Sequence, residues 1–339
     1  MAVLEINNVS KSFHSGGLWS GRKNLAVDQV SFNLSGEAPW VLGIVGESGS
    51  GKTTLARMIL RLLSPTLGTI RINGVLAKRE LNTSREMISF KRLVQPVFQN
   101  PFDTFSNRRE VYNYLIDTAT NLEVAKNASE ARSMVAAALE AVGLSANYVR
   151  GKFSRQFSGG ELQRISIARA LVAKPALIVA DEPVASIDAS LKMSVVNLFI
   201  RLKEQFNTSF IYITHDLATS YYLSDYVAIM YKGKVVEYGP SAEIMIDPVH
   251  PYTILLMESL AEVGKRWIMD DSLVSANAPD QTGPVNFLSG CPFYSRCRFA
   301  RDVCRQESPP LVELSDSRTS LCFRHVNYQM KNANEPNVP

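Results

Sequence analysis

The most constraining feature of this 339-residue sequence is a glycine-rich stretch, GESGSGKTT, at residues 46–54. It matches the phosphate-binding pattern G-x-x-x-x-G-K-[ST] at every fixed position. An apolar run at residues 40–45 predicts a buried strand before it, and apolar residues at helical spacing over 55–63 predict a helix after it. In that context, loop N–H groups converge on phosphate oxygens at a helix N-terminus. We therefore expect a nucleoside triphosphate to bind here. The residues assigned to it are Gly46, Ser48, Gly49, Ser50, Gly51, Lys52, Thr53 and Thr54.

Two further strands are predicted to end in polar side chains. One apolar run is followed directly by Asp181 and Glu182, and a second, at residues 209–214, by His215. Ligands of doubly wound α/β sheets gather at the carboxyl ends of the strands. Asp181 is therefore expected to complete a Mg²⁺ site beside Thr53. Glu182 is expected to orient or deprotonate the attacking water, with His215 at the same edge.

Composition excludes several classes of protein. Apolar residues make up 46% and charged residues 20%, which is typical of a globular protein. A net charge of +4 is too small to predict nucleic-acid binding. No apolar run approaches the roughly 18 residues that a membrane-spanning helix needs, and the first residues lack the pattern of a secretory signal. A cytosolic protein is expected.

The segment between the two phosphate motifs indicates a family. It contains FSGGELQR at residues 157–164, ahead of a helical run, and VFQNP at residues 97–101. With the carboxylate pair, the loop at Asp188 and His215 in this order and spacing, the sequence resembles an ATP-binding-cassette (ABC) ATPase. The resemblance covers essentially the whole chain. It implies an α/β fold with a RecA-like P-loop core, an antiparallel β subdomain and a helical subdomain.

The resemblance also implies residue roles. Phe13 corresponds to the aromatic residue that stacks on adenine, and Gln99 to the glutamine that contacts Mg²⁺ or water and senses the transport partner. Ser158, Gly159 and Gly160 correspond to the family's signature motif, which binds the γ-phosphate held by an opposite subunit. Two cassettes therefore meet head to tail around two ATP molecules. Asp188 links the two sites across that dimer. The implied catalytic set is Glu182, His215, Gln99 and Lys52; the Mg²⁺ ligands are Thr53, Gln99 and Asp181; the signature is Ser158, Gly159, Gly160 and Glu161.

Departures from the family pattern are mild. The signature begins with Phe157 and ends with Glu161, where leucine and glutamine are commonest, and Ile187 stands before Asp188 where leucine is usual. None of these changes removes a catalytic group. We therefore expect the chain's own Walker site to be competent for hydrolysis.

The C-terminal third indicates a branch of the family. Residues 226–237 predict a two-stranded hairpin with a Lys-Gly turn. The segment DPVHPYT at 247–253 resembles the hallmark of the oligopeptide, dipeptide and nickel importer ATPases. The resemblance implies a second ATPase subunit, often a paralogue, two membrane permease subunits and an extracytoplasmic substrate-binding protein. It places the chain peripherally on the cytoplasmic side of a bacterial or archaeal inner membrane. Peptides are the expected cargo, with oligosaccharides and nickel complexes as alternatives.

Two other classes of ABC ATPase fit less well. Those that act on DNA or ribosomes carry coiled-coil insertions, zinc modules or two cassettes in one chain, and this sequence shows one cassette without them. An exporter ATPase would usually be fused to its membrane domain or lack the His250-Pro251-Tyr252 segment. No nucleic-acid partner is expected.

The cysteines are clustered with the spacing C-x5-C-x6-C-x17-C, at Cys291, Cys297, Cys304 and Cys322. Disulfides are not expected in a reducing compartment, whereas four thiolates can hold a metal centre that folds a small segment. The paired C-x2-C knuckles typical of zinc are absent. Relatives with this tail are associated with a 4Fe–4S cluster, which tolerates irregular spacing. A structural 4Fe–4S cluster is the preferred interpretation, with zinc and unmetallated thiols as alternatives. Arginines that could offset its charge are Arg296, Arg298, Arg301 and Arg305.

The predicted organisation is an ABC nucleotide-binding domain at residues 1–260 and a C-terminal extension at 261–339. Residues 101–157 are expected to form the helical subdomain, which docks a permease near Gln99. An amphipathic helix within it is predicted to begin after Asn127 and to end at Gly143. Irregular segments are predicted at residues 14–24, 262–290 and 328–339.

Overall fold

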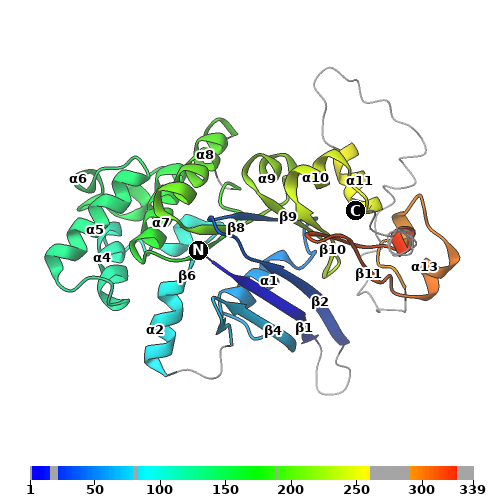
Figure 1. Ribbon diagram of the computed structural model, residues 1–339. Coiled ribbons are helices and arrows are strands. Elements are labelled where there is room, and N and C mark those ends of the chain that lie inside the picture. Colours follow the sequence, from blue (N-terminus) through cyan, green and yellow to red (C-terminus); the bar gives the residue numbers. More distant parts are fainter. Residues whose placement is uncertain are drawn as a thin grey trace, which may run out of the picture.

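The computed structural model describes residues 2–15, 22–78, 83–185, 187, 189–259 and 290–326. Asp188 and nearly all of the predicted linker lie outside the described residues, as do the last dozen residues and most of the predicted loop at 14–24. Figure 1 shows a helical part and a small C-terminal module, residues 290–326, at opposite ends of a central sheet. None of the helices in these ranges combines the length and the apolar character that crossing a membrane would require.

The central sheet holds the functional edge of the molecule. In the described part of the chain it has eight strands in the order β11-β12-β10-β9-β3-β8-β7-β6. Five neighbours, β9, β3, β8, β7 and β6, run parallel. Strands β3 and β8 are buried at every residue, as expected where both faces of a parallel sheet are covered. The parallel strands are β3 (Val41–Val45), β6 (Val94–Val97), β7 (Leu177–Asp181), β8 (Ser209–Thr214) and β9 (Tyr226–Tyr231). The strands predicted around the phosphate motifs are confirmed.

The predicted hairpin is also confirmed. Strand β9 turns into β10 (Lys234–Pro240) through Lys232 and Gly233, whose φ angles of 43° and 83° suit a tight two-residue turn. The far edge of β10 pairs with β12 (Arg318–Leu321), which pairs in turn with β11 (Leu311–Ser315). The C-terminal module therefore extends the sheet of the cassette, which the sequence did not predict.

The helix after the glycine-rich loop differs from its prediction. Helix α1 spans Lys52–Ile59, whereas the apolar spacing predicted residues 55–63. It begins inside the motif because Gly51, with φ of 103°, forms its N-cap. It ends early because Arg61 takes a left-handed conformation, with φ of 62°.

A second, antiparallel sheet confirms the predicted β subdomain. Its order is β2-β1-β4-β5 among the described residues. Its strands are β1 (Leu4–Ser15), β2 (Arg22–Leu34), β4 (Leu67–Ile72) and β5 (Val75–Leu76). Leu4 and Ile70 of this sheet share one buried core with Ile44 of β3 and Leu55 of α1. That core holds α1 between the two sheets (Figure 1).

The helical part contains the predicted amphipathic helix. The Asn127 side chain accepts a hydrogen bond from Glu130 N at 2.9 Å and caps α5 (Ala128–Ala141). Gly143, with φ of 78°, follows the end of the helix as predicted. Around α5 lie α3 (Pro101–Thr104), α4 (Val111–Asn121), α6 (Ala146–Val149), a 3-10 turn at Ser154–Gln156 and α7 (Gly159–Val172). Helix α7 begins beyond the predicted range but packs against α4 and α5, since Leu162 and Ile165 share one core with Leu115 and Val135.

The remaining helices connect and cover the strands. They are α2 (Ser84–Leu93), α8 (Ala189–Phe206), α9 (Leu217–Leu223), α10 (Ser241–Ile246), α11 (Pro251–Glu258), α13 (Asp302–Gln306) and 3-10 turns at Tyr294–Arg296 and Phe323–His325. Near β9, a third core joins Val45 and Tyr231 of the cassette to Tyr252 of α11 and Phe293 of the C-terminal module.

Candidate functional site

Two glycines let the loop at residues 46–54 lie against neighbouring strands. A Cβ on Gly46 would stand 2.1 Å from Met230 O of β9, and one on Gly51 would stand 2.3 Å from Ala26 O of β2. The Gly51 N-cap contributes no side-chain hydrogen bond, so the first N–H groups of α1 have no intrahelical or capping partner. Such N–H groups, at the positive end of the helix dipole, are suited to bind phosphate.

Lys52 lies folded over this loop. Its Nζ donates hydrogen bonds to Gly46 O at 2.7 Å and Glu47 O at 2.8 Å. Burial lowers the pKa of Lys52, and the nearby carboxylates of Glu182 and Asp181 oppose that effect. The ammonium is therefore held between the loop and the carboxylate edge, within the region where a bound phosphate chain would lie.

The carboxyl ends of β7 and β8 bring the predicted catalytic residues together. Thr53 Oγ1 donates to Asp181 Oδ1 at 3.4 Å. Gln99 Nε2 donates to Glu182 Oε2 at 3.0 Å, and His215 Nδ1 lies 3.3 Å from Glu182 Oε1. Gln99 and His215 thus both contact the carboxylate of Glu182, which is predicted to act on the attacking water.

This edge also has the chemistry of a Mg²⁺ site. Burial raises the pKa of Asp181 above its usual range, and the Thr53 hydrogen bond partly counters it. A divalent cation would offset the cost of burying this charge, and hydroxyl and carboxylate oxygens are ligands that Mg²⁺ prefers. A cavity of about 440 Å³ opens beside Thr53, Gln99 and Asp181. The residues present therefore fit the ion.

The backbone at Glu182 is unusual. Its φ of 45° lies in the left-handed region, and its N–H donates to Ile213 O of β8 at 2.9 Å. Non-glycine residues adopt this conformation at a cost that surrounding structure must offset. The neighbouring strand therefore fixes the direction in which this carboxylate leaves the sheet.

The signature residues form the start of α7. Ser158 caps the helix by accepting from Glu161 N at 3.2 Å, and Glu161 Oε2 accepts from Ser158 N at 2.8 Å. Tyr148 Oη donates to the other Glu161 oxygen at 2.7 Å. The pKa of Glu161 is lowered by the backbone bond from Ser158 and then by Tyr148. Glu161, a departure from the family pattern, thus completes a capping box with Gly159 and Gly160 in the first turn.

The remaining nucleotide-site prediction lies on the β subdomain. The Phe13 ring is exposed near the end of β1, with Lys11 Nζ 5.5 Å from its centroid. Strand β1 pairs with β2, whose Ala26 borders Gly51. The ring is therefore free to stack on a flat ligand. Asp188 lies outside the described residues.

The His250-Pro251-Tyr252 segment reaches the phosphate loop, a link that sequence reasoning missed. His250 Nδ1 accepts from Tyr252 N at 3.0 Å and caps α11, with Pro251 at its first position. The Tyr252 hydroxyl then accepts from Glu47 N at 3.1 Å. Burial lowers the pKa of His250 to about 3, so the ring is neutral and able to accept.

Known proteins match the chain in the same two regions. A family model described as "ABC transporter" matches residues 27–185, and one described as "Oligopeptide/dipeptide transporter, C-terminal region" matches residues 236–304. The oligopeptide transport ATP-binding protein AppF of Bacillus subtilis is 37% identical over 326 residues, covering 94% of this chain and 96% of the relative. The chain belongs to the ABC transporter family.

Another relative extends over nearly the same length of this ABC ATPase. The di/tripeptide transport ATP-binding protein DppF of Pseudomonas aeruginosa is 34% identical, covering 94% of this chain and 97% of the relative. Among solved structures, the dimeric cassette MJ0796 bound to ADP and Pi has a TM-score of 0.60 at 24% identity, covering 70% of this chain and 98% of that one. The cassette cbiO1 of Clostridium perfringens has a TM-score of 0.61 at 23% identity, covering 72% and 90%. These structures show the ABC fold.

The four cysteines of the ABC ATPase are all free thiols. Burial, with a smaller contribution from the charges of Cys304, Cys322 and Cys297, raises the pKa of Cys291 to about 11. The described residues contain no group of three or more His, Cys, Asp or Glu side chains arranged to hold a metal ion. The thiols lie near enough for their charges to influence the pKa of Cys291, but the described part of the chain holds no ready-made site for a metal ion.

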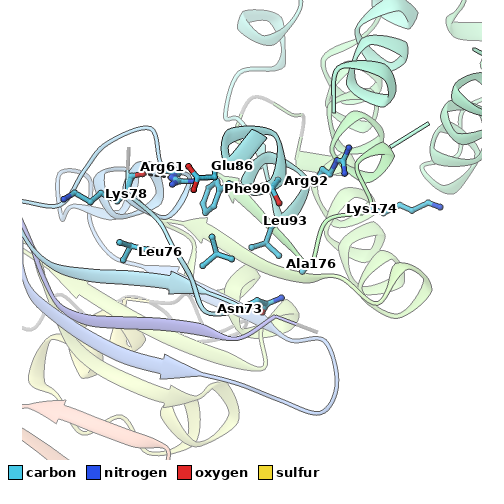
Figure 2. A pocket seen from close by; sticks show the side chains of 12 residues that line it. Arg61, Asn73, Leu76, Lys78, Glu86, Phe90, Arg92, Leu93, Lys174 and Ala176 are labelled. Atoms are coloured by element: carbon cyan, nitrogen blue, oxygen red, sulfur yellow. Dashed lines mark hydrogen bonds between the residues drawn. The ribbon is translucent and has the colours of Figure 1, made fainter. Parts of the chain in front are cut away.

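A larger cavity, of about 630 Å³, lies between β5, α2 and the end of α1, away from the phosphate loop (Figure 2). Two arginines of its lining, Arg61 and Arg92, are bound to other residues of the same chain. Arg61 Nε donates to Lys78 O at 2.6 Å and the guanidinium stacks 4.7 Å from the Phe90 centroid. Arg92 pairs with Glu123 at 3.1 Å. The cavity therefore contributes nothing to the nucleotide site.

Proposed function

We propose that this chain is the ATPase subunit of a binding-protein-dependent importer that takes up peptides. The observation that carries the proposal is the joining of an assembled hydrolytic edge to a C-terminal region of the oligopeptide/dipeptide type. Relatives named for oligopeptide and di/tripeptide transport align over nearly the whole chain, which favours peptides over oligosaccharides or nickel complexes.

In the proposed reaction, Lys52 moves from the loop carbonyls to the β- and γ-phosphates. Thr53, Asp181 and Gln99 would hold Mg²⁺, which neutralises phosphate charge when bound. Glu182 accepts the proton of the attacking water. Gln99 and His215 orient its carboxylate, as their hydrogen bonds to its two oxygens support.

We propose that two cassettes enclose ATP together. Ser158 and the glycines after it would contact the γ-phosphate held by the partner cassette, and Asp188 would link the two sites. A signature helix that is already capped can present its first turn without reorganising. Loss of the γ-phosphate removes that contact and opens the pair.

We propose that this opening and closing drives two permease subunits. An extracytoplasmic binding protein would deliver the peptide to them. The second ATPase would be a paralogue, and the pair would lie at the cytoplasmic face of the inner membrane. The helical part near Gln99 would dock the permease. We place the domain boundary near residue 260.

We further propose that Cys291, Cys297, Cys304 and Cys322 hold a structural 4Fe–4S cluster. The charges of Cys297, Cys304 and Cys322 raise the pKa of Cys291, so the four thiols lie near one another, which supports the proposal. The raised pKa values of Cys291, Cys297 and Cys322 mean that metal binding there must displace protons. Protein purified without oxygen should contain iron and acid-labile sulfide. Bound zinc without sulfide would contradict the cluster.

The hydrolytic assignment is tested with Glu182→Gln in this chain, combined with the equivalent substitution in the partner cassette of a purified complex. Removing the base should lower ATP turnover by at least ~100-fold while ATP still binds. Lys52→Ala, combined with the equivalent substitution in the partner cassette, should abolish ATP binding and transport together. Turnover near wild type in the Glu182 variant would contradict its role as base.

The cargo assignment needs a separate assay. The complex, reconstituted in vesicles with its binding protein, should accumulate labelled di- and oligopeptides only with ATP. Uptake of oligosaccharides or nickel complexes instead would overturn the peptide assignment and leave the ATPase assignment intact.

A further inference from the structure

Glu47, the second residue of the phosphate loop, is held by two groups far away in the sequence. Its N–H donates to the Tyr252 hydroxyl at 3.1 Å. Its carboxylate pairs with Arg296, whose Nη1 lies 3.0 Å from each of the two oxygens. Its carbonyl oxygen in turn accepts from Lys52 Nζ at 2.8 Å and from Ser50 N at 3.2 Å. The position of Glu47 therefore fixes the shape of the loop and the place where Lys52 lies.

Arg296 is itself rigidly placed. Its side chain is 14% exposed, and its guanidinium lies 5.8 Å from the Tyr231 centroid and 5.7 Å from the Phe293 centroid. The rings of Tyr231, Phe293 and Tyr252 pack on one another with centroids 4.6–5.5 Å apart. The backbone turn that carries Arg296 is closed by Arg296 N donating to Phe293 O at 3.1 Å. The cysteine-containing module thus presents a fixed cation to the phosphate loop.

We propose that Arg296 is a positioning residue of the ATP site, through which the C-terminal module sets the affinity for nucleotide. Without Arg296, Glu47 keeps only its contact with Tyr252, the loop samples more conformations, and ATP must order the loop when it binds. The catalytic edge at Glu182 and His215 lies on other strands and keeps its geometry. The expected signature is a change in ATP affinity without a change in the rate of the chemical step.

The test uses Arg296→Gln in the full chain and in its assembled complex. Kd for ATP, measured by titration calorimetry on the purified chain, should rise roughly 5- to 20-fold, within the usual range for coupled sites. KM should rise in parallel in the complex, with kcat within about twofold of wild type. Arg296→Lys keeps the charge at one point and should restore part of the affinity.

Arg298→Gln is the matched control. It removes an arginine from the same module that pairs with Glu258 at 2.8 Å, at an exposed site away from the loop. This variant should bind ATP as the wild type does. Equal losses in Arg296→Gln and Arg298→Gln would point to general damage to the module and overturn the proposal.

A second variant separates positioning from folding. Glu47→Gln leaves the C-terminal module untouched and should weaken ATP binding by a similar factor. The double variant Glu47→Gln/Arg296→Gln should lose no more affinity than either single variant, because both remove one contact. Additive losses, or a lower melting temperature with unchanged Kd, would overturn the role of Arg296. Failure of the peptide assignment would leave these results unaffected.

Discussion

At two positions of the phosphate loop, neighbouring strands lie so close that only glycine fits. A Cβ added at Gly46 would clash with the backbone of β9, and one added at Gly51 would clash with that of β2. Glu182 differs from these glycines, because its carboxylate is needed for the reaction although its backbone is in the left-handed conformation that glycine adopts most easily. The site therefore needs glycine at Gly46 and Gly51, where neighbouring strands approach, and a strained backbone at Glu182, the residue assigned to act on water.

Gly46→Ala should weaken ATP binding and lower turnover while leaving the protein folded. Its Cβ would stand 2.1 Å from Met230 O, a backbone atom that moves only with β9. Displacement of the loop by about 1 Å should cost roughly 100-fold in turnover. ATP titration and a turnover assay provide the measurement. The control is Gly74→Ala, at a left-handed turn with open space around it, which should cost about 1 kcal/mol of stability and no activity.

Capping decides where the functional helices begin. Ser158 and Glu161 start α7 with a reciprocal pair of bonds, and His250 starts α11 with a ring nitrogen in place of the usual hydroxyl or carboxylate. Burial keeps that ring neutral by lowering the pKa of His250 to about 3, with nearby His325 adding to the effect. The cap that positions Tyr252 is thus a buried titratable group.

This cap should make the protein sensitive to acid. The unfolded chain takes up a proton at His250 below its ordinary pKa of 6.5, and the folded chain does so only near 3. The stabilisation is complete above pH 6.5 and is lost as pH falls towards 3, reaching about 2 kcal/mol lost by pH 5. His250→Asn keeps an acceptor for the cap without titrating. Its melting temperature should fall less between pH 7.5 and pH 5 than that of the wild type; an equal fall would contradict this assignment.

At the scale of the whole molecule, the central sheet runs from the cassette into the C-terminal module. Strand β12 covers the edge of β10, and Arg318 of β12 pairs with the buried Glu237 of β10 at 2.9 Å. Glu237 also accepts from Val249 N and His250 N, at the start of α11. One buried carboxylate therefore ties together the sheet, the module and the helix that reaches the phosphate loop.

Arg318→Met should destabilise the whole protein by about 3 kcal/mol, because it leaves the Glu237 charge buried with only backbone donors. Arg109→Met, which removes an exposed pair with Asp117, is the control and should cost less than about 1 kcal/mol. Thermal unfolding measures both. Adding Glu237→Gln to Arg318→Met should recover part of the loss. Equal melting temperatures for Arg318→Met and Arg109→Met would show that the pair between Arg318 and Glu237 does not hold the module to the cassette.

Local patterns were enough to locate most of the candidate site. The glycine-rich motif, the apolar strands before Asp181 and His215, and the Asn127 cap each depend on neighbours a few residues away. Strand alternation placed Glu182 and His215 at one edge, and the structure brings them to 3.3 Å. The helix bounds after the motif were wrong because backbone conformation at Gly51 and Arg61 overrode the apolar spacing.

By itself, the sequence determined the α/β class, the phosphate loop and the family, since these follow from short-range spacing of residue types. Tertiary structure alone decided how the C-terminal module meets the site. Arg296 and Glu47 are 249 residues apart, and Tyr252 and Glu47 are 205 apart. No periodicity links residues at such separations. Their contact depends on how β12 extends the sheet and how three aromatic rings pack, which is a property of surfaces that exist only once the chain has folded.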